Sequence, residues 1–500
     1  MPLRITGMNS GLDTESIITE LVKAKKTKVD NTKKEQTKLQ WKQDAWKELN
    51  TKLLNLYQKT CGTLRFSTAY MKKKTTSSNA NAVSVVTGEN AVNGVQSINV
   101  DKLAKTGYLT GDQLSTDKSY TKDTKLSEIK DENGDLMFDG AGSISVTIDG
   151  KTTDISLSGD TTIGSVVSQL QSAGVNANFD ENNQRLFISA KKSGAANDFS
   201  ITANDLDGSK AMEALGIGSK AKRILGQDAE ITLNEATFKS ATNTFQINGL
   251  TITAQAETTE AFALTTQDDT DGIYDTIKNF IKEYNSLVNE MDKLYNAESA
   301  KGYEPLTDEE KDEMSDSEIE KWEEKIKASI LRRDSTLSSV ASGMKSAMAE
   351  GVEVNGKKMY LSDFGVNTLS YFLSAENEKY AYHIDGDVDD SNTSGNADKL
   401  KSMIASDPET VTSFFTGLAN NLYTTMSKLS SSVDGYRSYN SFYYDKKMKE
   451  DYSNYTKKIS ELEDKLTAYE DKWYDKFSAM ETALSKLQSS ESSLSSLLGG

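Results

Sequence analysis

The side chains that most often carry out catalysis or hold metal ions are scarce in this sequence. It contains one histidine, His383, and one cysteine, Cys61, among 500 residues. A Ser-His-Asp triad would have to use His383, which lies in a segment rich in tyrosine, aspartate and asparagine. Zinc and iron sites usually need several imidazole or thiolate ligands, and a single cysteine excludes a disulfide within the chain. We therefore expect no catalytic residues, no metal site and no cofactor.

Carboxylates are abundant, and one run of them resembles a calcium-binding loop. The run begins at Asp385 and continues through Asp387, Asp389 and Asp390. An EF-hand loop needs glycine at its sixth position and glutamate at its twelfth. Here those positions hold Asp390 and Asn396, so we interpret the run as an acidic surface loop. The sequence also has no P-loop and no dinucleotide-binding fingerprint after a strand.

The overall charge limits the class of partner. The formal net charge is −17, from 58 basic and 75 acidic residues. Phosphate backbones and anionic membranes are bound by basic surfaces, so we expect neither nucleic acid nor a membrane as a partner. No apolar run approaches the roughly 20 residues that span a bilayer, and residues 1–7 show no signal-peptide core. Composition alone leaves open a cytoplasmic protein or one exported without a cleaved signal.

The N-terminal end carries a helical pattern. Asp13 or Thr14 can cap a helix that continues to about Tyr57 without glycine or proline. Its apolar positions include Ile17, Leu21 and Trp41. A row of lysines on the same segment is interpreted as a solvated helix face; it comprises Lys23, Lys25, Lys26, Lys28, Lys33 and Lys34.

The C-terminal end carries a heptad repeat. Six apolar residues recur every seven positions, and they are Ile459, Leu466, Trp473, Met480, Leu487 and Leu494. The companion heptad position holds Leu462, Tyr469, Ala483 and Leu497, and is interrupted by Lys476 and Ser490. This spacing predicts a coiled-coil seam or a helix buried in a bundle. The seam alone leaves open whether its partner is the N-terminal helix or another subunit.

The middle of the chain is rich in strand signals. Alternating residues on both sides of Asp149-Gly150 predict a β-hairpin. Helical spacing from Ile163 to Leu170 and an apolar run at 185–190 complete a compact module over 140–202. A second strand-rich stretch covers 230–254.

Helical patterns return after the strands, at 273–291, 307–327 and 399–430, the last with a cap near Asp407-Pro408-Glu409. Because the apolar stripes of the two ends must be covered, we expect these ends to meet. The sequence thus predicts an α+β, multidomain fold with a discontinuous helical coiled-coil or bundle base formed by both termini and two inserted β-rich domains. The predicted domains are 1–45 with 440–500, 46–75 with 270–439, 76–115 with 220–269, and 116–219.

The opening run from Arg4 to Val22, the stretch from Asp160 to Ala190 and several later segments are spread in order over nearly the whole chain. Together they resemble the flagellar filament cap family, also called hook-associated protein 2 or the FliD family. The opening run RITGMNSGLDTESIITELV is similar to the opening of that family. The stretch from Asp160 to Ala190 is similar to a module shared with flagellin-type proteins. The other similar segments are 226–231, 243–253, 303–311 with 320–323, and FSAMETALSKL at 477–487.

This resemblance implies a secreted, non-enzymatic protein at the distal tip of the bacterial flagellar filament. Members of the family form homo-oligomers, roughly pentamers, and promote the folding and insertion of exported flagellin. The implied partners are other copies of the chain, flagellin, and the flagellar export apparatus with its chaperone. The terminal helices would form legs, the predicted coiled-coil domain, that contact the filament or neighbouring copies. The residues predicted to make those contacts are Ile17, Leu21, Trp41, Ile459, Leu462, Leu466, Trp473, Met480, Leu487 and Leu494.

Two other functions stay open on the sequence. A hook–filament junction protein or a flagellin shares helical ends and an inserted middle, although the closing segment and the one around Trp322 favour the cap. An adhesin that binds mucin or host glycans through residues 116–219 belongs to a different class. An enzyme would need a convergent pocket of polar residues, and the sequence shows none.

Overall fold

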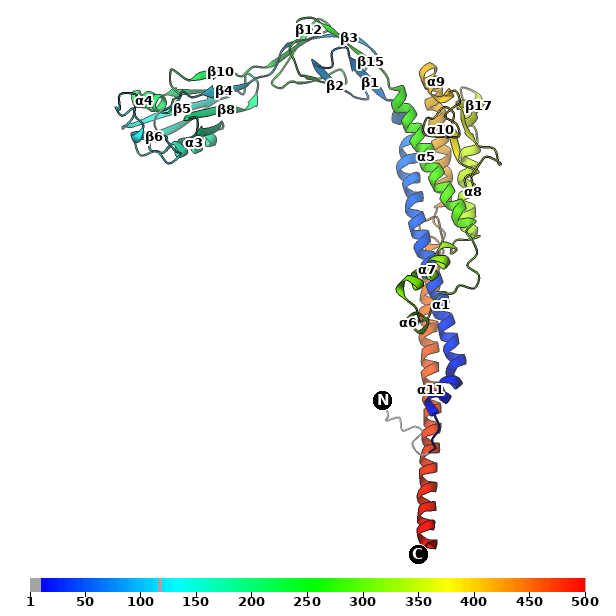
Figure 1. Cartoon of the computed structure of the whole chain (residues 1–500). Helices are drawn as coiled ribbons and strands as arrows, with labels where there is room; N and C mark the ends of the chain where they lie inside the picture. The colour runs from blue at the N-terminus through cyan, green and yellow to red at the C-terminus, as the bar shows by residue number, and fades with distance from the viewer. Residues whose placement is uncertain (1–9, 116–118, 500) are drawn as a thin grey trace. The chain divides into compact units, whose positions relative to one another are not determined.

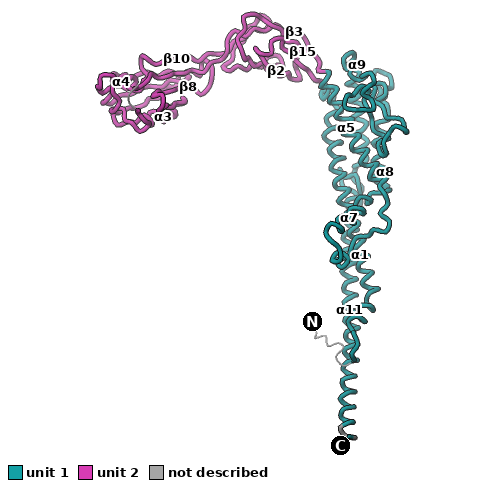
Figure 2. Tube along the Cα trace, viewed as in Figure 1, with its two compact units in different colours: residues 1–70, 270–500 teal, residues 71–269 magenta. Residues whose placement is uncertain are grey.

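The computed structural model describes residues 10–115 and 119–499, and the chain divides into two compact units. The helical unit combines both ends of the chain, up to Tyr70 and from Thr270 onward, and the β-rich unit is Met71–Asp269 (Figure 1 and Figure 2). The predicted α+β class, with helical ends around a β-rich middle, is confirmed.

The N-terminal helix begins where the sequence predicts. Helix α1 is Thr14–Leu54, and the carboxylate of Asp13 accepts a hydrogen bond of 3.0 Å from the backbone N–H of Ser16. The chain then continues through a π-helical stretch, Asn55–Cys61, and the short helix α2, Gly62–Leu64. The predicted end near Tyr57 therefore falls inside the π-helical stretch, because apolar periodicity does not distinguish it from an α-helix.

The core of the helical unit lies between the second half of α1 and four further helices. These are α5 (Thr270–Tyr295), α8 (Ser335–Ala349), α9 (Lys399–Ser406) and α10 (Pro408–Leu429). Asp407 caps α10 by accepting a hydrogen bond from the N–H of Thr410 at 3.1 Å, as the sequence predicts. The largest fully buried side chains of this core include Trp46, Tyr284, Phe280, Phe364, Phe414, Phe415 and Phe442.

The predicted helix over 307–327 is interrupted. The structure has two helices there, α6 (Asp308–Asp312) and α7 (Asp316–Ala328). Each begins with its own capping pair: the N–H of Thr307 donates to Glu310 at 2.7 Å and the N–H of Ser315 donates to Glu318 at 3.0 Å. Because the capping pair of Ser315 and Glu318 begins a new helix, α6 ends before it and α7 follows.

The remaining elements of the helical unit are two small hairpins, two 3₁₀ turns and the last helix. The hairpins pair β16 (Val352–Val354) with β17 (Lys357–Met359), and β18 (Val366–Thr368) with β19 (Tyr382–Ile384). The 3₁₀ turns are Ser67–Tyr70 and Leu361–Phe364. Helix α11 is Asp445–Leu498 and runs beside α1 (Figure 1).

The β-rich unit contains two hydrophobic cores. The first lies between a sheet ordered β1-β15-β3-β11-β12 and a sheet ordered β13-β14-β2. Their strands are β1 (Lys73–Ser77), β2 (Val83–Thr87), β3 (Gly94–Lys102), β11 (Ala229–Leu233), β12 (Ala236–Ser240), β13 (Thr244–Ile247), β14 (Leu250–Ala254) and β15 (Phe262–Asp268). Strands from both sides of the insertion thus pair with each other, as in β11 with β3.

The second core contains the predicted hairpin–helix–strand module. It is formed by the sheets β10-β4-β8-β7 and β6-β5-β9 with helices α3 (Ile163–Ser172) and α4 (Leu206–Ala214). The strands are β4 (Thr106–Thr110), β5 (Ala141–Ile148), β6 (Lys151–Ser158), β7 (Asn176–Asp180), β8 (Arg185–Ser193), β9 (Phe199–Ala203) and β10 (Lys222–Ile224), and a 3₁₀ turn covers Leu126–Glu128. Asp149 and Gly150 turn the β5–β6 hairpin with φ of 49° and 71°, the left-handed pair that a two-residue hairpin requires.

The domain boundaries set out above stay a prediction, since the contacts separate two units and not four. Among the described helices, none is both long and apolar enough to cross a membrane.

Candidate interface on the terminal helices

The apolar heptad positions of α11 from Ile459 to Met480, here called the seam, pack on α1. Ile459 is buried, and Leu462, Leu466, Trp473 and Met480 are half-buried. The opposing face of α1 contributes buried residues at spacings of three, four or seven positions, and they are Thr14, Ile18, Val22, Val29 and Thr32. Spacing of this kind places one stripe of side chains on one side of a helix.

Polar contacts fix the register of the two helices. The amide of Gln36 donates a hydrogen bond to the hydroxyl of Thr456 at 2.7 Å. Lys33 Nζ lies 2.6 Å from Glu463 Oε1.

Nearer the ends of the chain, the hydroxyl of Tyr474 donates to Glu15 at 3.2 Å, and the N–H of Ser10 donates to Glu481 at 3.2 Å. The partner that the sequence left open is therefore, for residues 456–481, the N-terminal helix of the same chain.

The last two apolar heptad positions lie beyond that pairing. Leu487 is 65% exposed and Leu494 is 58% exposed. Two large leucines in register with a covered seam, yet open to solvent, are suited to contact another molecule.

Two of the predicted contact residues of α1, Ile17 and Leu21, lie beside the seam and not in it. Ile17 and Leu21 are 37% and 38% exposed, while their neighbours Ile18 and Val22 are buried. Trp41 is half-buried, with the ammonium of Lys327 at 4.9 Å from its ring centroid. Ile18 and Val29 were not predicted as seam residues, although their spacing of four and seven positions from Val22 indicates that they share its face. The role of Ile17, Leu21 and Trp41 as contact residues stays a prediction.

The two polar residues that interrupt the heptad face solvent. Lys476 is exposed, and its Nζ lies 4.2 Å from the ring centroid of Trp473. Ser490 is also exposed, and its hydroxyl donates to the carbonyl of Lys486 at 2.9 Å. Neither side chain leaves a buried polar group at the interface with α1.

The acidic loop binds an ammonium group of the chain itself. Lys278 Nζ lies 2.5 Å from Asp387 Oδ1 and 2.7 Å from Asp389 Oδ2. Although burial opposes it, these hydrogen bonds raise the pKa of the Lys278 ammonium. His383 Nδ1 lies 2.5 Å from Asp390 Oδ2. Among residues 10–115 and 119–499, no group of three or more His, Cys, Asp or Glu side chains could hold a metal ion.

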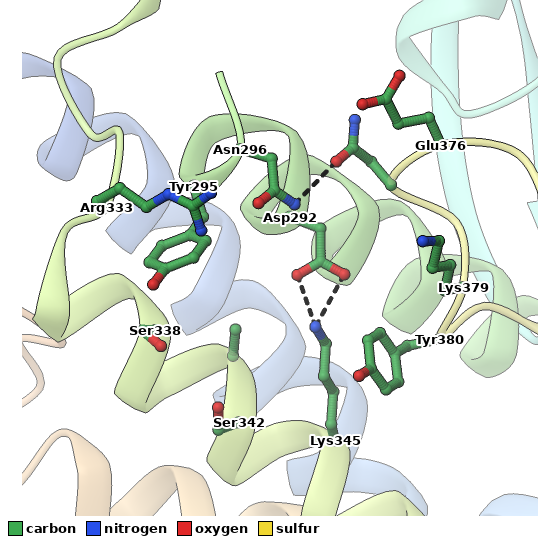
Figure 3. A pocket seen from close by; sticks show the side chains of 12 residues that line it. Asp292, Tyr295, Asn296, Arg333, Ser338, Ser342, Lys345, Glu376, Lys379 and Tyr380 are labelled. Atoms are coloured by element: carbon green, nitrogen blue, oxygen red, sulfur yellow. Dashed lines mark hydrogen bonds and ion pairs between the residues drawn. The ribbon is translucent and has the colours of Figure 1, made fainter. Parts of the chain in front are cut away.

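A pocket of about 460 Å³ in the helical unit is lined by residues of α5, of α8 and of the segment 376–380. Figure 3 shows Asp292 and Lys345 pointing toward each other across it, with Lys345 Nζ at 2.6 and 2.8 Å from the two carboxylate oxygens. The same ammonium lies 3.9 Å from the ring centroid of Tyr380. Because the acid and the base neutralise each other, we interpret this contact as one that joins α5 to α8.

Sequence profiles of one family match both ends of the chain. The profile described as flagellar hook-associated protein 2 C-terminus matches residues 226–489, and the profile of the N-terminus matches residues 10–107. The chain belongs to the flagellar hook-associated protein 2 family.

Individual hook-associated proteins are similar at low identity. A flagellar hook-associated protein 2 from Halalkalibacterium halodurans is 24% identical over 456 residues, which cover 85% of this chain and 81% of the relative. One from Thermotoga maritima is 26% identical over 69% of this chain and 54% of its own length. The crystal structure of flagellar cap protein FliD domains D1-D2-D3 from Escherichia coli is 20% identical with a TM-score of 0.50, covering 78% of this chain and 97% of that one. That last likeness shows a shared fold.

Most of the segments that carried the resemblance lie inside the hook-associated protein 2 match. Segments 226–231, 243–253, 303–311 and 477–487 fall within the C-terminal profile. The opening run is matched from residue 10, and residues 4–9 lie outside the described part of the chain. The stretch 160–190 lies between the two profiles, so its likeness to a flagellin-type module stays a prediction.

Proposed function

We propose that this chain is a flagellar filament cap protein, which is secreted, assembles at the distal tip and promotes insertion of exported flagellin. The observation that carries the proposal is the family match over residues 226–489, together with residues 10–107. The fold shared with a protein named flagellar cap protein supports it. A cap acts by binding and positioning, so it needs no catalytic site.

The proposed partners are other copies of this chain, flagellin, and the flagellar export apparatus with its chaperone. A homo-oligomer fits the family, and we propose roughly a pentamer. The net charge of −17 supports the expectation of no nucleic-acid partner.

The paired ends of α1 and α11 are proposed as the leg of the cap. The proposed leg is 1–45 with 440–500, carried by a helical bundle of 46–75 with 270–439. The exposed leucines Leu487 and Leu494 supply apolar surface for a filament or a neighbouring copy. A leg that detaches and rebinds as each flagellin is added needs contacts that are individually weak, and a half-buried seam with exposed ion pairs such as Lys33–Glu463 meets that need.

No observation favours the adhesin or the hook–filament junction protein over the cap. A glycan array with the full chain remains the test of the adhesin.

Immunogold electron microscopy of flagellated cells tests the cap directly, with an antibody raised against the full chain. We expect label confined to the free end of each filament. Label along the filament, or at the junction between hook and filament, would contradict the proposal and favour a flagellin or a junction protein respectively.

A further inference from the structure

One segment of the helical unit is bound to the lysine row of α1 chiefly by charge. Residues 303–328, here called the strap, contain α6 and α7 and carry eleven Asp or Glu against four Lys, a net charge of −7. Residues 23–42 of α1 carry eight Lys against two acidic residues, a net charge of +6. In a chain whose total is −17, the basic stretch and the acidic strap are complementary.

The complementary charges meet at specific ion pairs. Lys26 pairs with Glu309, Lys38 pairs with Glu304, and Lys34 Nζ lies 2.8 Å from Glu310 Oε2. The three lysines are four or eight residues apart and therefore share one side of α1.

The glutamates that the strap contributes to these ion pairs are exposed to solvent. The side chains of Glu309, Glu304 and Glu310 are 64%, 56% and 49% exposed. Exposed ion pairs contribute little each and are screened by salt.

Few apolar contacts add to the charges. Within the strap only Pro305 and Ile326 are buried, and α6 has no buried residue. Lys327 of the strap also lies over Trp41 of α1, with its Nζ 4.9 Å from the ring centroid. Other contacts are internal to the strap: the indole N–H of Trp322 donates to the carbonyl of Glu304 at 2.8 Å, and Lys325 Nζ lies 2.9 Å from the hydroxyl of Tyr303. A segment with few buried side chains opens at low free-energy cost.

The strap lies over part of the seam between the terminal helices. A pocket of about 530 Å³ remains between them, lined by Val29 and Trp41 of α1, by Pro305 and Leu306 of the strap, and by Ile459 and Leu466 of α11. A hollow of this size means that the strap covers these apolar residues without packing tightly on them. Removing the strap would expose that stretch of the seam.

We propose that the strap is an autoinhibitory cover, held by charge, that shields the α1–α11 seam in the free chain and exposes it to a second copy when it is released. The inference rests on the proposed function, since a leg that binds neighbouring copies is the part that needs such a cover.

Hydrogen exchange of the full chain, read by mass spectrometry, tests release of the strap. The variant Lys26→Glu with Lys34→Glu reverses the charge of two α1 residues that form ion pairs with the strap. We expect exchange in residues 303–328 to rise roughly three- to tenfold in low salt, as expected from losing two exposed ion pairs. Adding Glu309→Lys to the same chain should slow exchange again, because it restores the pair with Lys26 with the charges exchanged. Glu310 is kept in this charge-swapped variant because it caps α6.

The matched control is Lys28→Glu with Lys47→Glu. It makes the same change in net charge on two exposed lysines of α1 that form no ion pair in the described part of the chain. Exchange in the strap should stay at the wild-type rate. Equal exchange in the control and in the Lys26/Lys34 variant would overturn the charge-held strap.

Light scattering of the same four proteins tests the autoinhibition. The released variant should self-associate at a lower concentration than the control, and the charge-swapped variant should require a higher concentration than the released variant. A strap that is released without any change in self-association would overturn the inhibitory role. Neither measurement depends on motility, so the labelling of filament tips tests the cap function separately.

Discussion

Cys61 is fully buried in the core of the helical unit, at the end of the π-helical stretch. Burial raises the pKa of its thiol well above the ordinary value, and the thiolate is the form that reacts. We predict that a disulfide reagent such as Ellman's reagent leaves the native chain unmodified and titrates one thiol per chain in guanidinium. Rapid stoichiometric reaction of the native chain would contradict the placement of Cys61.

Leu53 and Leu487 are the same residue type in opposite surroundings, 0% and 65% exposed. We predict that Leu53→Ala lowers the free energy of unfolding by about 2–5 kcal/mol, because it leaves a cavity, and that Leu487→Ala changes it by less than about 0.5 kcal/mol. All four tryptophans, Trp41, Trp46, Trp322 and Trp473, lie in the helical unit. Tryptophan fluorescence in guanidinium titrations therefore follows that unit alone. If Leu53→Ala and Leu487→Ala lowered the free energy of unfolding equally, the placement of Leu53 in this core would be contradicted.

The residues of the seam were only partly predictable. The heptad from Ile459 to Met480 locates the covered face of α11, because one stripe repeats over several turns. In α1, Ile17 and Ile18 are equally apolar, and only the partner helix decides that Ile18 is buried and Ile17 is not.

At the scale of elements, the end of α11 is where the proposed leg makes its outer contacts. Leu487→Ser with Leu494→Ser should leave the unfolding midpoint unchanged, since both leucines are exposed, yet abolish swimming in soft agar. The exposed residues Ser489 and Ser492 supply the control, Ser489→Ala with Ser492→Ala, which should swim normally. Normal swimming of the leucine variant would remove these residues from the interface.

The interrupted heptad gives a second prediction for α11. Lys476→Leu with Ser490→Leu would extend the apolar stripe of a helix whose polar interruptions now face solvent. A continuous stripe binds more tightly, so we predict slower detachment of the leg and shorter filaments. Filaments of unchanged mean length in electron micrographs would contradict a role for these interruptions.

Local chemistry made some elements predictable and hid others. The Asp149-Gly150 turn and the Asp407-Pro408 cap were readable because the residues themselves require those conformations. The break between α6 and α7 was not, since Ser315 and Glu318 stand in an acidic run that is helical on both sides. The π-helical stretch at Asn55–Cys61 has no sequence signature of its own.

At the scale of the whole molecule, the return of the chain to its starting helix was predictable and the sheet orders were not. A helix with an uncovered apolar stripe must pack against a partner, and α1 and α11 are partners of each other. The pairing of β3 with β11 and β15 joins strands more than a hundred residues apart. Alternation of side chains fixes the faces of a strand but not its neighbours.

Deletion of the gene for this chain, with measurement of flagellin in the culture medium, tests the proposed function most directly. We predict cells that secrete flagellin monomers and build hooks without filaments, and that regain filaments when the full chain is supplied. Filaments of normal length and number in the deletion strain would contradict a cap that is needed for flagellin insertion.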